Sequence, residues 1–169
     1  MLFRSPVIQI VRNHPVYQTQ EARQQIEWLA QRRGPTDVVL VWYWAAPAFE
    51  WYAPRYGLAT SNTIAGGCWP AEPRNFLHDL ESLRGRPRVW LLVQAAFRPE
   101  AKLLFEFADQ IGTRLEGVSW RPDLETRLYD FSDTMRLQRA SASTFPVPQT
   151  RPSRFHLMSC PLGLFTIRE

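Results

Sequence analysis

Asp37-Val-Val-Leu-Val-Trp-Tyr-Trp44 is the stretch that decides the fold of this 169-residue chain. Its near-continuous run of β-branched, aliphatic and aromatic residues is the pattern of a strand that is covered on both faces. A second stretch, Val89-Trp-Leu-Leu-Val93, has the same character. We therefore expect two buried strands, the first of them a central parallel strand of an open sheet.

Four helical segments surround these strands. The 3.6-residue spacing of apolar side chains predicts helices over 19–32, 47–56, 74–83 and 99–111. Prolines suit the first turns of the second and fourth helices, and glycines follow the ends of both. Residues 58–73 are expected to form a loop that leaves room for one short strand.

Two further segments, 114–120 and 126–131, alternate in polarity and predict a closing pair of strands. This order of elements predicts an α/β fold, specifically a three-layer sandwich with a mostly parallel open sheet, flanking helices and an antiparallel closing strand pair. We expect residues 1–133 to form this domain. Repeated prolines and a Ser-Ala-Ser-Thr run predict that residues 134–169 are a flexible extension.

Composition excludes several classes of protein. No window approaches the roughly 18 consecutive apolar residues of a membrane-spanning helix, and the first six residues do not predict a secretory signal. Cys68 and Cys160 lack the spacing of a disulfide framework or a redox pair, so we expect free thiols.

The net charge of +4 is carried by residues 134–169, since residues 1–133 hold equal numbers of basic and acidic side chains. No basic stripe predicts nucleic-acid binding.

Motifs that carry chemistry are missing from the sequence. The three histidines are scattered without a second ligand at metal spacing, and no nucleophile elbow, P-loop or dinucleotide-binding glycine loop occurs. Acidic residues form three close pairs, at 79 and 81, 123 and 125, and 130 and 133. Their positions on a helix and beside turns favour solvation and capping over catalysis. We therefore predict no catalytic residue, no metal site and no cofactor in this chain.

A ligand site has one candidate position. Crevices in open α/β sheets form outside the carboxyl ends of the strands, so Tyr43, Trp44 and Gln94 are candidates to line a pocket there. The alternative is that the two aromatic rings pack in the core, which is the commoner role of such residues and the one that we favour.

Three stretches together resemble a known protein family. Residues 37–52, Arg88-Val-Trp-Leu-Leu-Val93 and Arg127-Leu-Tyr-Asp130 are similar to the soluble C-terminal region of bacterial membrane glycosyltransferases of the GT-C class, related to the protein mannosyltransferases of family 39 that use dolichyl-phosphate-mannose. The resemblance covers residues 14–131. Two departures are Trp44, where the family has glycine, and Gln94-Ala95, where a Ser-His-like pair is usual.

The resemblance implies transfer of a sugar from a polyprenyl-phosphate donor by a parent enzyme, on the extracytoplasmic face of the inner membrane. The family's catalytic acids lie in loops between membrane spans, none of which is in this sequence. The chain is then expected to be an accessory domain that packs on the transmembrane part, or a split-off fragment without present activity. The alternative is a free-standing cytoplasmic α/β module that binds a small ligand such as a nucleotide or sugar.

Overall fold

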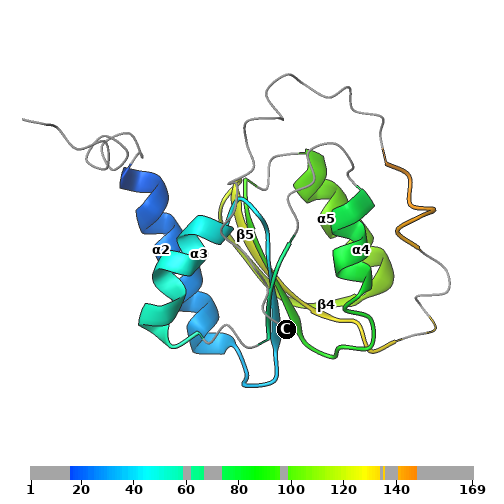
Figure 1. Ribbon diagram of the computed structural model, residues 1–169, viewed down its shortest axis with the longest axis horizontal. Coiled ribbons are helices and arrows are strands. Elements are labelled where there is room, and N and C mark those ends of the chain that lie inside the picture. The colour runs from blue at the N-terminus through cyan, green and yellow to red at the C-terminus, as the bar shows by residue number, and fades with distance from the viewer. Residues whose placement is uncertain are drawn as a thin grey trace, which may run out of the picture.

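The computed structural model describes residues 16–58, 62–66, 74–95, 99–133, 135 and 141–147, with side chains from residue 21 onward except that of Asn75. These residues form an α/β fold, a five-stranded open sheet with helices packed against it. Helices α2 (Val16–Arg32) and α3 (Ala46–Tyr52) lie on one side of the sheet, and α4 (Arg74–Glu81) and α5 (Pro99–Ile111) lie on the other (Figure 1). Within the described residues, no helix combines the length and the apolar character needed to cross a membrane.

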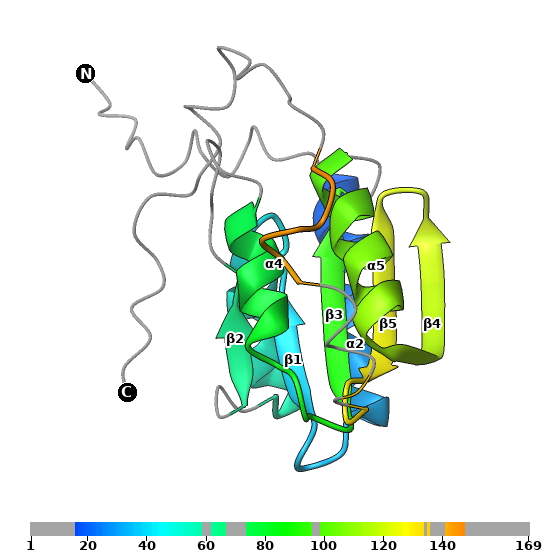
Figure 2. The ribbon, with the colours of Figure 1, turned by 90° about the vertical axis from the view of Figure 1, so that its right-hand side faces the viewer.

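The strands are arranged in the order β2-β1-β3-β5-β4 (Figure 2). Their bounds are Thr63–Ala65 for β2, Val38–Val41 for β1, Val89–Gln94 for β3, Leu124–Asp130 for β5 and Thr113–Arg121 for β4. Strand β1 is parallel to both β2 and β3, whereas β5 is antiparallel to both β3 and β4. The sheet is therefore mixed and not mostly parallel as expected, because the closing hairpin pairs with β3 and supplies two of the four pairings.

The two strands predicted to be buried are confirmed. All four residues of β1 are buried, and the first five residues of β3 are fully buried. Helices cover both faces of these strands, which explains why neither strand alternates polar and apolar residues. The edge strand β4 shows the opposite pattern, with most of its side chains exposed.

The predicted helices also form, with small changes at their ends. The second is divided into α3 and a short 3-10 helix, η1 (Ala53–Tyr56), and Gly57 ends it with a φ of 66°. Glycine adopts this left-handed conformation without the steric cost that a Cβ would add. Gly112 follows α5, where a Cβ would overlap the ring of Phe131, so that only glycine lets α5 pass this close to the end of β5.

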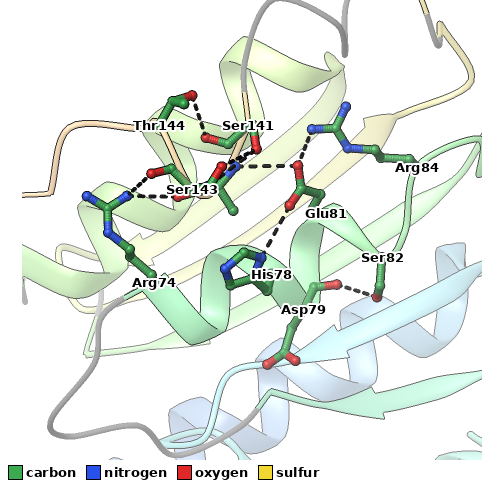
Figure 3. A network of polar contacts seen from close by, with 10 residues as sticks. Arg74, His78, Asp79, Glu81, Ser82, Arg84, Ser141, Ser143 and Thr144 are labelled. Atoms are coloured by element: carbon green, nitrogen blue, oxygen red, sulfur yellow. Dashed lines mark hydrogen bonds and ion pairs between the residues drawn. The ribbon is translucent and has the colours of Figure 1, made fainter.

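Part of the segment beyond residue 133 packs on the domain. Residues 141–147, which we name the strap, lie against α4 and α5. Ala142 and Phe145 are buried, and the Phe145 ring meets that of Phe107 edge to face with centroids 5.3 Å apart. The guanidinium of Arg74 on α4 donates to the carbonyl oxygens of Ala142 and Ser143 at 3.0 and 2.8 Å (Figure 3). It also donates to the carbonyl oxygen of Phe145 at 3.1 Å.

Glu81 is the second anchor of the strap. One of its carboxylate oxygens accepts from Arg84 at 2.6 Å and from the backbone N–H of Ala142 at 3.4 Å, and the other lies 3.3 Å from His78 Nδ1 (Figure 3). Burial opposes ionisation of this group, but these donors outweigh it and hold the pKa of Glu81 below its ordinary value. A charged carboxylate thus ties the strap to the end of α4.

Candidate functional site

The predicted ligand site lies where two parallel strands end. Strands β1 and β3 are neighbours, and their carboxyl ends lie at the same edge of the sheet. The chain leaves β1 toward α3 on one face and leaves β3 toward α5 on the other (Figure 1). Departure to opposite faces makes this edge a topological switch point, the position at which open α/β sheets form crevices.

The aromatic residues after β1 form one continuous cluster. The ring of Trp42 lies 4.6 Å from that of Tyr43 and 5.2 Å from that of Phe76, and Tyr43 and Trp44 are 5.7 Å apart, measured between centroids. Tyr43 and Trp44 are half-buried and pack against the core. The structure thus brings two of the three candidate residues together, in an arrangement in which they contribute to packing.

Gln94 belongs to a separate network that faces α2. Its side-chain nitrogen donates to Oε1 of Gln25 at 3.4 Å. Nε2 of Gln25, which is fully buried, reaches the carbonyl oxygens of Val93 and Glu125 at 3.2 and 3.0 Å and Oγ1 of Thr126 at 3.1 Å. These bonds satisfy polar groups at the junction of β3 and β5, where they would otherwise be desolvated without partners.

Gln25 was not predicted as a functional residue, although the sequence contains a signal for it. It lies on the same face of α2 as Ala22 and Leu29, three residues after one and four before the other. A polar residue within an apolar helical stripe indicates a buried polar contact, because the burial of an unpartnered amide is costly.

Two features at the switch point mark it as more than ordinary packing. Ala95, immediately after β3, has a φ of 58°, a left-handed conformation that is uncommon outside glycine. Trp42 is 2% exposed, and its indole Nε1 has no hydrogen-bond partner within the part of the chain that the structure describes. A buried indole N–H without an acceptor lowers the stability of the fold by about 1–3 kcal/mol, and it remains able to donate to a ligand.

A buried carboxylate lies at the opposite edge of the sheet. Asp37 is 1% exposed and accepts hydrogen bonds from Arg88 Nε at 2.8 Å, Trp90 Nε1 at 2.8 Å and the backbone N–H of Gly34 at 3.0 Å. Burial alone would raise the pKa of Asp37, but the bonds from Arg88, Gly34 and Trp90 lower it below its ordinary value. This fully partnered anion joins the starts of β1 and β3.

The acidic pairs noted in the sequence serve local structure. Glu81 anchors the strap, Asp123 pairs with Arg121 at 3.1 Å, and Glu125 pairs with Arg127 at 2.7 Å. Oδ1 of Asp130 accepts from the backbone N–H of Ser132 at 2.8 Å, and the hydroxyl of Ser132, followed by this N–H, lowers the pKa of Asp130. Each of these four carboxylates thus has a structural partner within the domain.

Metal binding has no candidate group among the described residues, since no three His, Cys, Asp or Glu side chains gather there. The sequence positions 14, 68, 156 and 160, which hold two histidines and both cysteines, lie outside the described residues. The predictions made for these residues are therefore not tested.

Comparisons of the chain with protein-family models, curated proteins and solved structures found no match.

Proposed function

We propose that this chain is an accessory soluble domain of a membrane glycosyltransferase that uses a polyprenyl-phosphate sugar donor, and that it is not catalytic by itself. One observation carries the proposal: the residues that resemble the family contact one another. Asp37 from the first resembling stretch bonds to Arg88 and Trp90 from the second, although 51 and 53 residues separate them. Two of the resembling stretches are therefore in contact in the folded domain.

The third resembling stretch joins the same sheet. Strand β5 contains Arg127-Leu-Tyr-Asp130 and pairs with β3. Tyr129 is fully buried and donates to Asp109 at 2.6 Å. Burial and this bond raise the pKa of the Tyr129 phenol above its ordinary value. Arg127 lies 3.7 Å above the ring of Phe105. The side chains of Tyr129 and Arg127 both make contacts within the domain, which supports a structural role for the stretch.

The proposal has several parts. The partner is the transmembrane part of the parent enzyme, through which the domain would serve a polyprenyl-phosphate sugar donor on the extracytoplasmic face of the inner membrane. The domain is proposed to be a three-layer sandwich, which the helices on either side of the sheet in Figure 1 support. Its contribution would be to bind acceptor or to order loops of the parent.

A reading of the DNA upstream of the Met1 codon tests this proposal. All frames of about a kilobase would be translated and searched for apolar windows of about 20 residues. Continuous or frameshifted membrane spans are expected; their continuity would also separate an intact domain from a split-off remnant. Upstream DNA that encodes no spans would rule the proposal out.

A second candidate function is a free-standing cytoplasmic module that binds a nucleotide or sugar at the switch point. The unpartnered indole N–H of Trp42 favours it, because a ligand carbonyl, hydroxyl or phosphate would satisfy that donor. A thermal-shift panel of nucleotides and sugars tests it. A ligand that stabilises the wild-type chain but not Tyr43→Ala would support this function, and the absence of a shift across the panel would count against it.

A further inference from the structure

The strap, residues 141–147, is held by the domain much as a separate peptide would be. It belongs to none of the helices and strands, and ten positions of the sequence separate its first residue from Asp130 at the end of β5. The pairings among the five strands do not involve it. Detachment of the strap would therefore break none of those pairings.

Helix α4 holds the strap through main-chain atoms. The Arg74 guanidinium donates to the carbonyl oxygens of Ala142, Ser143 and Phe145. Glu81, at the other end of α4, accepts from the backbone N–H of Ala142, and both side chains point toward the strap in Figure 3. Contacts to main-chain atoms supply affinity in several modes of peptide recognition, while pockets for side chains supply specificity.

Two apolar side chains of the strap supply that specificity. Ala142 is fully buried, and Phe145, three positions later, is 5% exposed with its ring edge to face against Phe107 of α5. The two residues between them are exposed. We name Arg74, Glu81 and Phe107 the strap seat. These contacts favour an occupant that places a small residue three positions before an aromatic one.

The strap also fixes its own shape. The carbonyl oxygen of Ser141 accepts from the backbone N–H groups of Thr144 and Phe145 at 3.1 and 2.9 Å, and Oγ of Ser141 accepts from the backbone N–H of Ser143 at 3.3 Å. All of these bonds lie within the segment, so they do not depend on which chain it belongs to. A segment that forms its own turn loses less conformational entropy when it docks.

We propose that the strap seat binds the strap as an exchangeable ligand and accepts the strap of a second copy of this chain. Every copy carries both the seat and the segment that fits it, so exchange replaces each contact by an identical one, as in domain swapping. The chain's own strap is favoured at low concentration, because its tether gives it an effective concentration on the order of 1 mM. The inference goes beyond the proposed function, since none of these residues lies in the three resembling stretches.

A released variant of the full chain tests recognition of the strap. Ala142→Asp places a second carboxylate in a buried position beside Glu81, so its own strap should leave a seat that keeps all three residues. A capped, fluorescein-labelled peptide of residues 141–147 should bind this variant at least about tenfold more tightly than wild type, whose own strap competes. Fluorescence anisotropy measures both affinities, and wild-type amide exchange in β3 shows that the variant is folded.

Matched changes separate the seat from general charge and apolar attraction. In the Ala142→Asp background, Arg74→Ala should weaken peptide binding at least about tenfold, because three main-chain acceptors lose their donor. Arg86→Ala removes an exposed arginine beyond α4 and should leave the affinity unchanged. A peptide with Phe145→Ala should bind at least about tenfold more weakly, whereas one with Ser143→Ala should bind as the parent does.

A mixture of two full-length variants tests the second copy as the occupant. Ala142→Asp has an intact seat without a docked strap, and Arg74→Ala has an intact strap whose own seat lacks its main anchor. Analytical ultracentrifugation should show a one-to-one complex in the mixture, which neither variant forms alone.

Two results would overturn the proposal directly. One is the absence of peptide binding to the folded Ala142→Asp chain, or binding that survives Arg74→Ala. The other is peptide binding without a complex in the mixture, because the seat would then not accept a second copy. If Ala142→Asp does not fold, isotope-labelled wild type replaces it: excess unlabelled peptide should accelerate amide exchange over 141–147, and unchanged exchange would overturn the proposal. None of these results bears on the transferase proposal, which the upstream DNA tests.

Discussion

Replacement of Asp37 by asparagine should lower the free energy of unfolding by about 2–4 kcal/mol. The carboxylate is buried, and three donors converge on it at 2.8, 2.8 and 3.0 Å. Asparagine has nearly the same shape, but it lacks the charge and turns an NH₂ group toward donors. The buried Trp90 N–H then loses a charge-assisted bond worth about 1–3 kcal/mol. Arg88 is 43% exposed and can turn to water, so its loss adds at most about 1 kcal/mol.

Urea unfolding at neutral pH, followed by far-ultraviolet circular dichroism, measures this free energy. A double-mutant cycle with Trp90→Phe isolates the indole bond, since phenylalanine keeps an aromatic ring and removes the donor. Asp37→Asn should cost about 1–2 kcal/mol less in the Trp90→Phe background than in the wild type. Asp123→Asn is the matched control, because Asp123 pairs with Arg121 at the surface and its replacement should cost under about 0.5 kcal/mol.

Two results would refute this reasoning about the buried network. One is a cost for Asp37→Asn that does not exceed the cost for Asp123→Asn. The other is an equal cost in the wild-type and Trp90→Phe backgrounds, which would mean that the indole bond does not contribute to stability.

Three other predictions address pH, the strap and the end of α5. The folded-state pKa of Asp37 lies below its unfolded-state pKa, so the stability that the carboxylate contributes is complete above the unfolded-state pKa and is lost as pH falls through the folded-state pKa. In urea titrations, the difference in unfolding free energy between wild type and Asp37→Asn should therefore disappear over that pH range. Arg74→Ala should release three carbonyls of the strap, and amide exchange over 141–147 should accelerate at least about tenfold while exchange in β3 is retained; unchanged exchange would mean that Arg74 does not hold the strap. Gly112→Ala should lower the melting temperature by roughly 5 °C or more, because a Cβ meets the Phe131 ring; an unshifted melting curve would contradict that steric reading.

The main elements could be predicted because their signals are local. Buried strands such as β1 and β3 have continuous apolar runs, and helices such as α5 have regular apolar spacing between a proline and a glycine. The short strand β2 could be anticipated only as a possibility within a long loop. Its three half-buried residues have no pattern of their own, and their pairing with β1 makes them a strand.

Features that depend on distant contacts could not be predicted. The Ser- and Pro-rich composition of residues 134–169 indicates a flexible extension, yet Ala142 and Phe145 are buried against α4 and α5. Their burial depends on the position of Arg74, about 70 residues earlier in the chain. Similarly, the mixed character of the sheet depends on the choice of β3 as the partner of β5, for which the sequence of neither strand contains a local signal.

The candidate ligand site shows the same division between local and distant information. The rule that crevices form at the carboxyl ends of parallel strands led to Tyr43, Trp44 and Gln94, and β1 and β3 do end side by side. The partners of these side chains come from other elements, such as Gln25 on α2 for Gln94 and Phe76 on α4 for the aromatic cluster. A strand pattern contains no information about either.

The contacts of Asp37 also limit what a family resemblance can say about function. An aspartate before one strand and an Arg-Val-Trp run that begins another form a recognisable pattern, and an acid with an arginine could suggest chemistry. In this chain Arg88 neutralises Asp37 at the starts of β1 and β3 and donates to its Oδ1, and the indole of Trp90 donates to its Oδ2. These contacts join the starts of β1 and β3, so the pattern has a structural explanation in this chain. Evidence for a partner must therefore come from residues that the fold does not use.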